Sequence, residues 1–466
     1  MELDKQACDR ARLARDARFD GRFFIGVTST GIYCRPVCPA PSPKASNVKY
    51  YPSAAAAAEA GFRPCLRCRP EASPGTPAWL GSSTSVSRAL KLIAESALDD
   101  GGVEDLAGRL GLGSRHLRRL FLRYLGATPV AVAQTRRVHF AKKLIDETGL
   151  PMTHVALAAG FGSIRRFNAT FQKLYGRTPR ELRRAAARSR NGHEAGHYTF
   201  RLGYRPPYDW RSLIEFLAPR ATPGVETVDP DSYHRTISLD GHTGAITVRP
   251  VAAKNQLELQ IRFPDPAVLF RIVERVRKIF DLGADPAEVS EHLKHDPRLK
   301  PIVKAHPGLR APGCWDGFEI AVRAILGQQV SVKGATTLAG RLAAEFGVKL
   351  ADSGGILFPQ PAVLAGADLT RIGMTKQRAG SIRGLAEAVA CGEIVFDGSL
   401  DLEDFERKIT GIRGIGPWTA QYVAMRLGEP DAFPGSDLYL RDFARGADAW
   451  RPWRAYAAMY LWKGQS

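Results

Sequence analysis

A repeated segment in the first half of the chain restricts its fold more than any other feature. FLRYLGATP at 121–129 returns as FQKLYGRTP at 171–179, an offset of 50 residues that aligns Phe, Gly, Thr and Pro. In each copy a short amphipathic stretch and a glycine-containing turn precede a second amphipathic stretch, which predicts two helix-turn-helix motifs in tandem. The apolar and turn positions behind this prediction are Val103, Leu106, Leu110, Gly111, Gly113, Leu117, Leu120 and Phe121, then Val155, Ala158, Ala159, Gly160, Gly162, Ile164, Phe167 and Phe171.

The whole chain is too long for one hydrophobic core. With 466 residues, 44% of them apolar, it is expected to form several globular domains. Low-order stretches predict linkers at 71–85 and 185–197 and a connection between subdomains at 301–313. The alternating segments TISL, AITVRPV and LELQIRF predict a small antiparallel sheet with loop glycines Gly241 and Gly244, and the later pattern is helical.

The chain carries a strong positive charge. Its formal net charge is +19 and its pI about 9.8, which indicates a polyanionic partner, with nucleic acid the first choice. A basic enzyme without such a partner is the alternative. Because no apolar run has bilayer length and the start MELDKQACDR lacks the apolar core of a signal peptide, we expect a cytoplasmic, nucleoid-associated protein without membrane contact.

Four of the seven cysteines lie in two close pairs. Three residues separate Cys34 from Cys38, two separate Cys65 from Cys68, and 26 lie between the pairs. This spacing is typical of a tetrahedral Zn²⁺ site, whereas a disulfide framework is not expected in a reducing compartment. We therefore predict that the four cysteines bind one Zn²⁺, the alternative being four unlinked structural thiols.

A glycine-rich turn marks the C-terminal third. GIRGIGPWT at 411–419 lies between the acidic segment DLEDFERKI and the segment WTAQYVAMRL, both helical in pattern. Its backbone N–H groups and the next helix N-terminus predict a hairpin that binds a phosphate without reading bases. Asp437 follows Gly416 by 21 residues. Since an isolated aspartate at a helix edge is more often a cap, the functional interpretation depends on the combination of hairpin and aspartate.

The hairpin, Asp437 and RAILGQQVSV at 323–332 resemble the helix-hairpin-helix glycosylase superfamily. PPYDWRSLIEFLAPR at 206–220 and HPGLRAPGCWDGFE at 306–319 extend the resemblance to bacterial 3-methyladenine DNA glycosylase II. The resemblance implies hydrolytic excision of alkylated bases such as 3-methyladenine from a nucleotide flipped out of the duplex, with Asp437 stabilising the oxocarbenium ion and positioning water. It also implies a base pocket of Phe216, Trp418, Tyr422 and Trp462, and DNA contacts from Gln328, Gly414, Gly416 and Thr419.

Several positions refine this expectation. Trp418 stands where glycosylase/lyase relatives carry a Schiff-base lysine, so we expect a monofunctional enzyme. Gln329 replaces the apolar wedge expected beside Gln328, and Leu438 and Lys463 stand where tyrosines are expected. Core packing is the alternative role for the four aromatic rings, which are otherwise expected to stack on a cationic base.

The context of the cysteines carries a second resemblance. TGIYCRPVC and GFRPCLRC resemble the methylphosphotriester-repair domain of the Ada family over residues 1–75. This implies that Cys34 accepts a methyl group as well as binding metal, since a thiolate can displace methyl from a neutral phosphotriester. Methylation removes one negative charge, so repair is expected to strengthen DNA binding. Arg35 and Arg67 are candidate phosphate contacts or, alternatively, solvated surface charges, and PAP at 39–41 replaces the family's basic residue.

Residues 85–185 resemble the AraC-type DNA-binding domain, with recognition helices that begin near Ser114 and Ser163. Basic side chains there supply affinity through counterion release, whereas base contacts set specificity. The family implies transcription regulation, with RNA polymerase as a partner. The candidate DNA contacts are Arg115, Arg118 and Arg165, together with His116, Arg119, Arg166 and Asn168.

These patterns predict a multidomain, mainly α chain that acts as a monomer on alkylated double-stranded DNA. Two alternatives stay open: a transcription regulator with a catalytically passive glycosylase half, and a glycosylase whose N-terminal half, with a structural zinc, only targets it to DNA. No segment resembles the Pro-Cys-His-Arg site that repairs O6-methylguanine, so that activity is not expected. The expected domains are a zinc α+β domain at 1–78, the tandem helix-turn-helix domain at 82–186, a β-rich subdomain with connecting helices at 198–305 and the helical glycosylase domain at 306–466.

Overall fold

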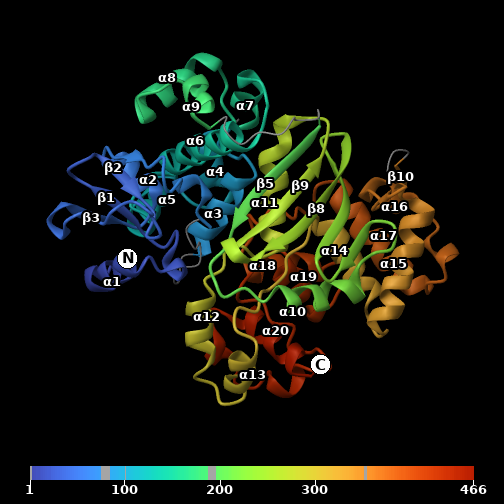
Figure 1. Ribbon diagram of the computed structural model, residues 1–466. Coiled ribbons are helices and arrows are strands. Elements are labelled where there is room, and N and C mark those ends of the chain that lie inside the picture. The colour runs from blue at the N-terminus through green and yellow to red at the C-terminus, as the bar shows by residue number, and fades with distance from the viewer. Residues whose placement is uncertain (1–2, 75–83, 100, 187–195, 351–353, 466) are drawn as a thin grey trace. The chain divides into compact units, whose positions relative to one another are not determined.

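The computed structural model of the chain describes residues 3–74, 84–99, 101–186, 196–350 and 354–465 (Figure 1). Over these residues the protein is mainly helical, as expected, and it divides into two compact units. Most of the two expected linkers lies outside the described residues. The first unit comprises Met1–Pro206, Val251–Glu274 and Leu282–Asp285, and the second comprises Pro207–Pro250, Arg275–Asp281 and Pro286–Ser466.

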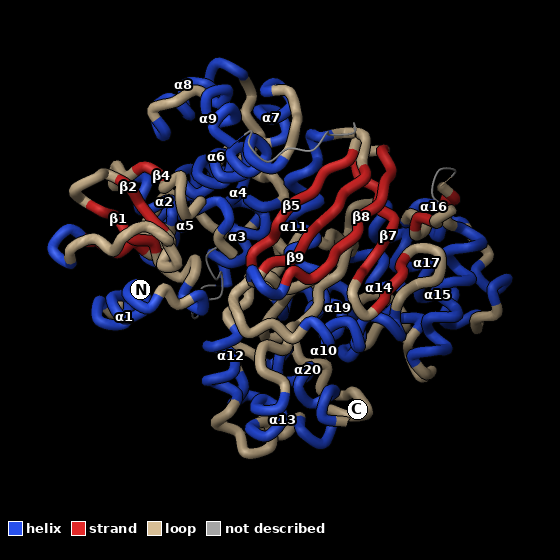
Figure 2. Tube along the Cα trace, viewed as in Figure 1, coloured by secondary structure: helices blue, strands red, loops and turns tan. Residues whose placement is uncertain are grey.

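The cysteine-containing region of the first unit is a four-stranded sheet with the order β3-β1-β2-β4 (Figure 2). Its pairs are antiparallel except for β2 with β4, which run parallel. Helix α2 packs on the sheet through a run of alanines, and their small side chains let it lie close to Phe24, Tyr33 and Phe62. The elements are α1 (Lys5–Ala14), β1 (Phe24–Val27), β2 (Ile32–Cys34), β3 (Val48–Tyr51), α2 (Ala54–Glu59) and β4 (Arg63–Pro64).

The repeated region forms two helix-turn-helix motifs joined by the long helix α6, which confirms the sequence prediction. The helices that the repeat aligns, α5 and α8, each end at a glycine with a left-handed backbone, Gly126 with φ 65° and Gly176 with φ 64°. Ile164 is 37% exposed, so its assignment to the apolar face is wrong: the buried face of α8 begins at Phe167. The helices are α3 (Thr84–Ala94), α4 (Val103–Arg109), α5 (Ser114–Leu125), α6 (Pro129–Glu147), α7 (Met152–Ala158), α8 (Ile164–Tyr175) and α9 (Pro179–Ala186).

The expected antiparallel strands are present in both units. In the first unit β5 pairs with β9, and in the second β7 pairs with both β6 and β8. Asp240 and Gly241 form the turn between β7 and β8 and both have positive φ, whereas Gly244 lies inside β8 opposite Ile237 rather than in a loop. The strands are β5 (His197–Gly203), β6 (Glu226–Asp229), β7 (Ser232–Leu239), β8 (His242–Val251) and β9 (Gln256–Arg262).

The rest of the second unit is helical apart from the short pair β10–β11. Helix α14 is its buried centre, with nine of its ten residues buried. The connection expected at 301–313 begins as a helix, α13, and the proline in its first turn is compatible with this because no N–H partner is needed there. None of the described helices has the length and apolar character of a membrane span. The further elements are α10 (Trp210–Leu217), α11 (Leu269–Ile279), α12 (Pro286–Leu293), α13 (Lys300–Ala305), α14 (Gly317–Leu326), α15 (Val332–Phe346), β10 (Val348–Lys349), β11 (Ile356–Leu357), α16 (Pro361–Gly366), α17 (Lys376–Ala390), α18 (Leu402–Thr410), α19 (Pro417–Arg426) and α20 (Arg454–Gly464).

Candidate functional site

The parallel pairing of β2 with β4 brings the two cysteine pairs together. Residues 32–33 lie opposite residues 63–64, so the next positions in register are Cys34 and Cys65. The Cys65 N–H donates to the Tyr33 carbonyl at 3.0 Å and fixes this alignment. One cysteine of each pair therefore lies at the same end of two neighbouring strands, where the chain leaves the sheet.

The four cysteine sulfur atoms form a cluster that fits one metal ion. All four lie within 4.8 Å of one another. Zinc–sulfur bonds of about 2.3 Å in a tetrahedron place the ligand sulfurs about 3.8 Å apart, so the set is compact enough for zinc. Cys65 and Cys68 are buried, whereas Cys34 and Cys38 are half-buried. Only the first pair is therefore open to an approaching molecule.

Arg35 is held by contacts within this domain. Its guanidinium forms an ion pair with the buried carboxylate of Asp20, with Nε 2.9 Å from Oδ1, and donates to the Cys68 carbonyl at 3.0 Å. The Arg35 backbone N–H also lies 3.3 Å from Cys68 Sγ. A phosphate contact from Arg35 would have to compete with Asp20, whereas Arg67 is exposed to solvent.

The strand that carries Cys34 also contacts the helix that joins the two helix-turn-helix motifs. The hydroxyl of Tyr33 lies 2.9 Å from Nε2 of His139 on α6. Arg69, just beyond the last cysteine, forms ion pairs of 3.0 Å and 3.2 Å with Asp146 and Glu147 of the same helix. The cysteine cluster is thus anchored to α6 from two sides.

The two candidate recognition helices present their basic residues to solvent. On α5, Arg115 and Arg118 are exposed while Leu117 and Phe121 are fully buried. On α8, Arg165 is exposed and Phe167 is fully buried. The same pattern holds for the neighbouring candidates, which are all exposed: His116, Arg119, Arg166 and Asn168.

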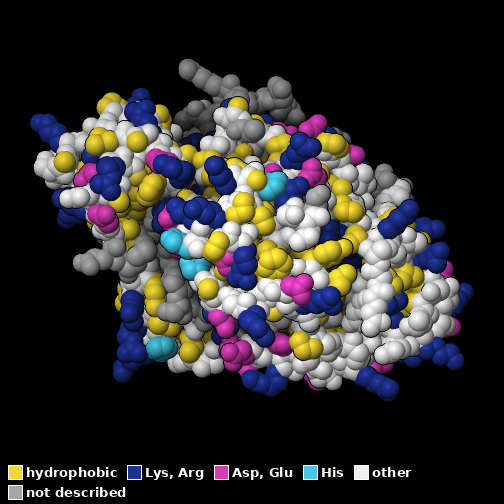
Figure 3. All heavy atoms as spheres, turned by 90° about the horizontal axis from the view of Figure 1, so that it is seen from below, with side chains coloured by type: hydrophobic (Ala, Val, Ile, Leu, Met, Phe, Trp, Pro, Cys, Tyr) yellow, Lys and Arg dark blue, Asp and Glu magenta, His cyan; other side chains and the backbone are white. Residues whose placement is uncertain are grey.

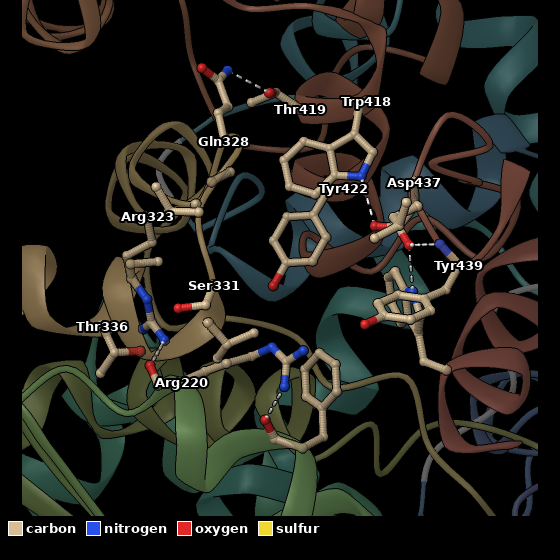
Figure 4. A pocket seen from close by; sticks show the side chains of 18 of the residues that line it. Arg220, Arg323, Gln328, Ser331, Thr336, Trp418, Thr419, Tyr422, Asp437 and Tyr439 are labelled. Atoms are coloured by element: carbon tan, nitrogen blue, oxygen red, sulfur yellow. Dashed lines mark hydrogen bonds between the residues drawn. The ribbon is translucent and has the colours of Figure 1, made fainter. Parts of the chain in front are cut away.

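In the second unit, Asp437 lies in a pocket and each of its carboxylate oxygens has a partner (Figure 4). Oδ2 accepts a hydrogen bond from Trp418 Nε1 at 3.1 Å. Oδ1 accepts two, from Trp462 Nε1 at 3.1 Å and from the Tyr439 backbone N–H at 3.0 Å. The sequence prediction did not include these contacts, although it selected both tryptophans.

The four candidate base-pocket aromatics lie next to one another. Figure 4 shows the rings of Trp418 and Tyr422 side by side. They are stacked, with their centroids 5.5 Å apart. Tyr422 meets Trp462 edge-on at 6.4 Å, and Trp462 stacks with Phe216 at 6.2 Å. Phe216 is buried, and the Arg220 guanidinium lies 4.0 Å from its ring centroid. One face of Phe216 is therefore already covered by a cation of the protein itself.

Three arginines that the sequence analysis missed surround Tyr422. Burial alone would raise the pKa of its phenol, but the charges of Arg426, Arg220 and Arg323 outweigh burial and hold that pKa below its usual value. Arg426 donates to the phenolic oxygen at 3.0 Å, and Arg323 is paired with Glu226 at 2.9 Å. These residues lie about a hundred positions apart along the chain, and no local pattern indicates that they meet.

The glycine-rich hairpin borders the same pocket. Gln328 uses its amide group to donate to the Gly414 carbonyl and to the Thr419 hydroxyl, both at 3.0 Å. Gly414 has φ +88°, and a Cβ there would lie 2.0 Å from the Ser381 Oγ. Three of the four candidate DNA contacts at this site therefore also hold the hairpin in place. Gly416 differs, because a Cβ there would meet nothing within 4 Å.

The residues that line the pocket include those that depart from the family pattern. Gln329 is exposed and has a left-handed backbone with φ 56°. Leu438 and Tyr439, directly after Asp437, are 64% and 55% exposed. Lys463 is the one lysine among the described pocket residues, and its amine forms an ion pair with Glu215 at 2.6 Å.

Basic side chains are widely distributed over the surface. On the face drawn in Figure 3, Lys and Arg side chains lie among acidic and apolar ones rather than in one patch. The net charge of +19 therefore supplies a general attraction for a polyanion. Where such a partner sits is better indicated by the recognition helices and the hairpin.

Four known domain families match consecutive parts of the chain. They are the metal binding domain of Ada over residues 7–71, a helix-turn-helix domain over 106–185, the AlkA N-terminal domain over 199–316 and the HhH-GPD superfamily of base excision DNA repair proteins over 322–461.

Whole-chain similarity points the same way. The chain is 42% identical over 481 aligned residues to the "Probable bifunctional transcriptional activator/DNA repair enzyme AlkA" of Mycobacterium tuberculosis, covering 99% of this chain and 97% of that protein. DNA-3-methyladenine glycosylase 2 of Escherichia coli is 35% identical and matches 56% of this chain and 96% of its own length. The solved structure of the 3-methyladenine DNA-glycosylase from Archaeoglobus fulgidus shares the fold, with a TM-score of 0.51 and 22% identity over 56% of this chain and 96% of that one.

Proposed function

Because the chain belongs to the family of the bifunctional transcriptional activator/DNA repair enzyme AlkA, we propose that it repairs alkylated double-stranded DNA with two separate sites. The second unit excises alkylated bases such as 3-methyladenine by hydrolysis. The observation that carries this proposal is the carboxylate of Asp437 beside stacked aromatic rings, next to a phosphate-binding type of hairpin.

Base excision follows from the placement of these groups. The bond between C1′ and the ring nitrogen breaks, and both electrons leave with the base, which loses the positive charge that alkylation gave it. The carboxylate of Asp437 stabilises the positive charge that develops on the sugar. A water oxygen then bonds to C1′, and its proton passes to the carboxylate or to solvent. The hairpin supports this by holding the backbone of a flipped nucleotide.

The pocket favours a monofunctional enzyme. A lyase needs an unprotonated amine that attacks C1′. Trp418 supplies an indole in the first turn of α19, and the amine of Lys463 is engaged by Glu215. Abasic DNA, rather than a cleaved strand, is therefore the proposed product.

The first unit is proposed to accept a methyl group at Cys34. Cys34, Cys38, Cys65 and Cys68 would hold Zn²⁺, which when bound keeps thiolates deprotonated at neutral pH. The Cys34 sulfur bonds to the methyl carbon of a phosphotriester, and the carbon–oxygen bond breaks to leave a phosphodiester anion. Cys34 is half-buried and Cys68 is buried, which favours Cys34 as the acceptor.

Methylation of Cys34 would increase the affinity of the first unit for DNA. One thiolate charge is lost near the DNA, so repulsion of phosphates falls. The contacts of Tyr33 with His139 and of Arg69 with α6 tie this change to the helix that carries both helix-turn-helix motifs. Transcription activation through RNA polymerase is the proposed consequence.

One experiment separates these activities. The full chain is incubated with methylated duplex, released bases are measured by chromatography, and methylated cysteines are located by peptide mass spectrometry. We expect free 3-methyladenine and a methyl group on Cys34. Cys391 is exposed and serves as the control for unspecific methylation. Base release with an unmodified Cys34 would favour an N-terminal half that only targets DNA, and modified Cys34 without base release would favour a passive glycosylase half.

A further inference from the structure

The contacts of Asp437 assign a second task to two of the pocket tryptophans. Trp418 comes from the first turn of α19 and Trp462 from the end of α20, yet their indole nitrogens converge on one carboxylate. Figure 4 shows the Trp418 nitrogen directed at Asp437. Stacking on a base uses the face of an indole ring and does not require its N–H to point at a carboxylate.

We propose that Trp418 and Trp462 are positioning residues for Asp437, which they hold through their indole N–H groups. The inference rests on the proposed function, in which Asp437 faces the developing charge on the sugar. Each indole donates to a different oxygen of the carboxylate, Trp418 to Oδ2 and Trp462 to Oδ1. With one donor on each oxygen, rotation of the carboxylate plane would break at least one hydrogen bond to an anion, which is among the stronger kinds.

The donors also limit what the carboxylate can do. An ionised carboxylate offers about four acceptor positions. Within the described part of the chain, the two indoles and the Tyr439 N–H use three of them, which leaves one on Oδ2. An indole N–H can donate but cannot accept, so it takes no part in proton transfer. Asp437 is thereby set up as an oriented negative charge with a single free position for water or the sugar.

The rings around the two tryptophans fix the direction of the N–H groups. Tyr422 stacks on Trp418 with an interplanar angle of 9° and meets Trp462 edge-on. Trp462 is in addition stacked with Phe216 at an interplanar angle of 26°. Because Trp418 packs against one of these rings and Trp462 against two, neither indole can turn away from Asp437 without disturbing its neighbours.

The test uses duplex DNA that carries no base at the lesion, so that stacking of the tryptophan rings on a base cannot contribute to the affinity. One probe has a neutral tetrahydrofuran in place of the sugar, and the other has a pyrrolidine that is cationic where the oxocarbenium charge develops. The ratio of the two dissociation constants reports how well a negative charge faces that position. We expect the wild-type chain to prefer the pyrrolidine, and Asp437→Asn to abolish most of the preference.

Trp418→Phe and Trp462→Phe keep an aromatic ring but remove the N–H group. Each is expected to lower the preference for pyrrolidine about ten- to a hundredfold, as for loss of a hydrogen bond to a charged group. Single-turnover excision of 3-methyladenine should fall by a similar factor, with a smaller change in the DNA concentration at half-saturation. Trp450→Phe is the matched control, because it also removes an indole N–H that donates to a carboxylate, that of Asp296 at 2.7 Å, but neither residue lines the pocket; it should keep the wild-type ratio.

The outcomes distinguish this inference from the proposed function. If Asp437→Asn abolishes the preference while both Trp→Phe variants keep it, the indoles only pack and stack, and the inference is wrong. If Asp437→Asn itself keeps the preference, the electrostatic role of Asp437 fails and the proposed function fails with it. Thermal unfolding of each variant identifies a loss of fold, and because the two tryptophans lie on different helices, each provides an independent test.

Discussion

Replacement of Gly414 by alanine should destabilise the hairpin. The residue has φ +88°, and a left-handed backbone costs a residue with a side chain about 1–2 kcal/mol. The new Cβ would also lie 2.0 Å from the Ser381 Oγ, which is buried and hydrogen-bonded to the Gln377 carbonyl. Displacing that hydroxyl costs about another 1–2 kcal/mol, so we expect a total of about 2–4 kcal/mol.

The two contributions can be separated. Ser381→Ala removes the Oγ and leaves its Cβ at 3.1 Å from the added methyl group, so Gly414→Ala combined with Ser381→Ala should recover about half of the loss. Gly416→Ala is the matched control for folding, because its φ of −98° suits any residue and its Cβ would meet nothing. It should unfold like the wild type and yet bind undamaged duplex more weakly, since the added methyl group obstructs the phosphate.

Thermal unfolding of the full chain, followed through tryptophan fluorescence, measures the first effect, and fluorescence anisotropy with labelled duplex at fixed salt measures the second. Equal unfolding of Gly414→Ala and Gly416→Ala would refute the steric explanation of the hairpin. Wild-type DNA affinity of Gly416→Ala would remove Gly416 from the proposed DNA contacts.

Three further results are expected. Metal analysis of the reduced protein should find one Zn²⁺ per chain. Chelation should unfold the region of the four cysteines, because metal binding and folding are coupled there. Less than about half an equivalent of zinc per chain would count against the site. Burial raises the pKa of Asp281 to about 6, so the folded state binds more protons than the unfolded state between about pH 4 and 6, and stability falls as pH rises through that window. In Asp281→Asn the side-chain oxygen can still accept hydrogen bonds from Tyr456 and the Ala311 N–H. The substitution should therefore raise the unfolding temperature at pH 7.5 but hardly at pH 4. An equal shift at the two pH values would contradict the raised pKa of Asp281. Arg67→Ala should weaken DNA binding and reduce its salt dependence without loss of fold. Arg35→Ala should instead destabilise the domain, because it leaves the buried Asp20 carboxylate unpaired. The reverse pattern would identify Arg35 as the phosphate contact.

The features predictable from sequence were those carried by local repetition or spacing. The repeat at 121–129 and 171–179 predicted both helix-turn-helix motifs, and the structure adds that the glycines aligned by the repeat end α5 and α8. The cysteine spacing predicted a cluster, and the parallel register of β2 and β4 supplies the reason that it forms.

The features that the sequence did not predict depend on side chains that are distant in sequence and meet only in the folded protein. Nothing near Arg35 indicates that Asp20 will bind its guanidinium, and nothing near Arg220 indicates that Arg323 and Arg426 will join it around Tyr422. The resemblance selected Trp418 for its ring, but the direction of its N–H is set by packing against Tyr422. Packing direction leaves no periodic signal in a sequence.

The carboxylate of Asp437 is proposed to carry the chemistry of base excision. Asp437→Asn preserves the volume of the side chain and removes its charge, and Asn can still accept one of the indole hydrogen bonds. The direct measurement is the single-turnover rate at which 3-methyladenine is released from alkylated duplex, with DNA affinity measured on the same preparation. We predict that the rate falls by at least about 100-fold and that DNA binding is retained. Release at the wild-type rate would show that Asp437 only caps its loop and that the proposed mechanism is wrong.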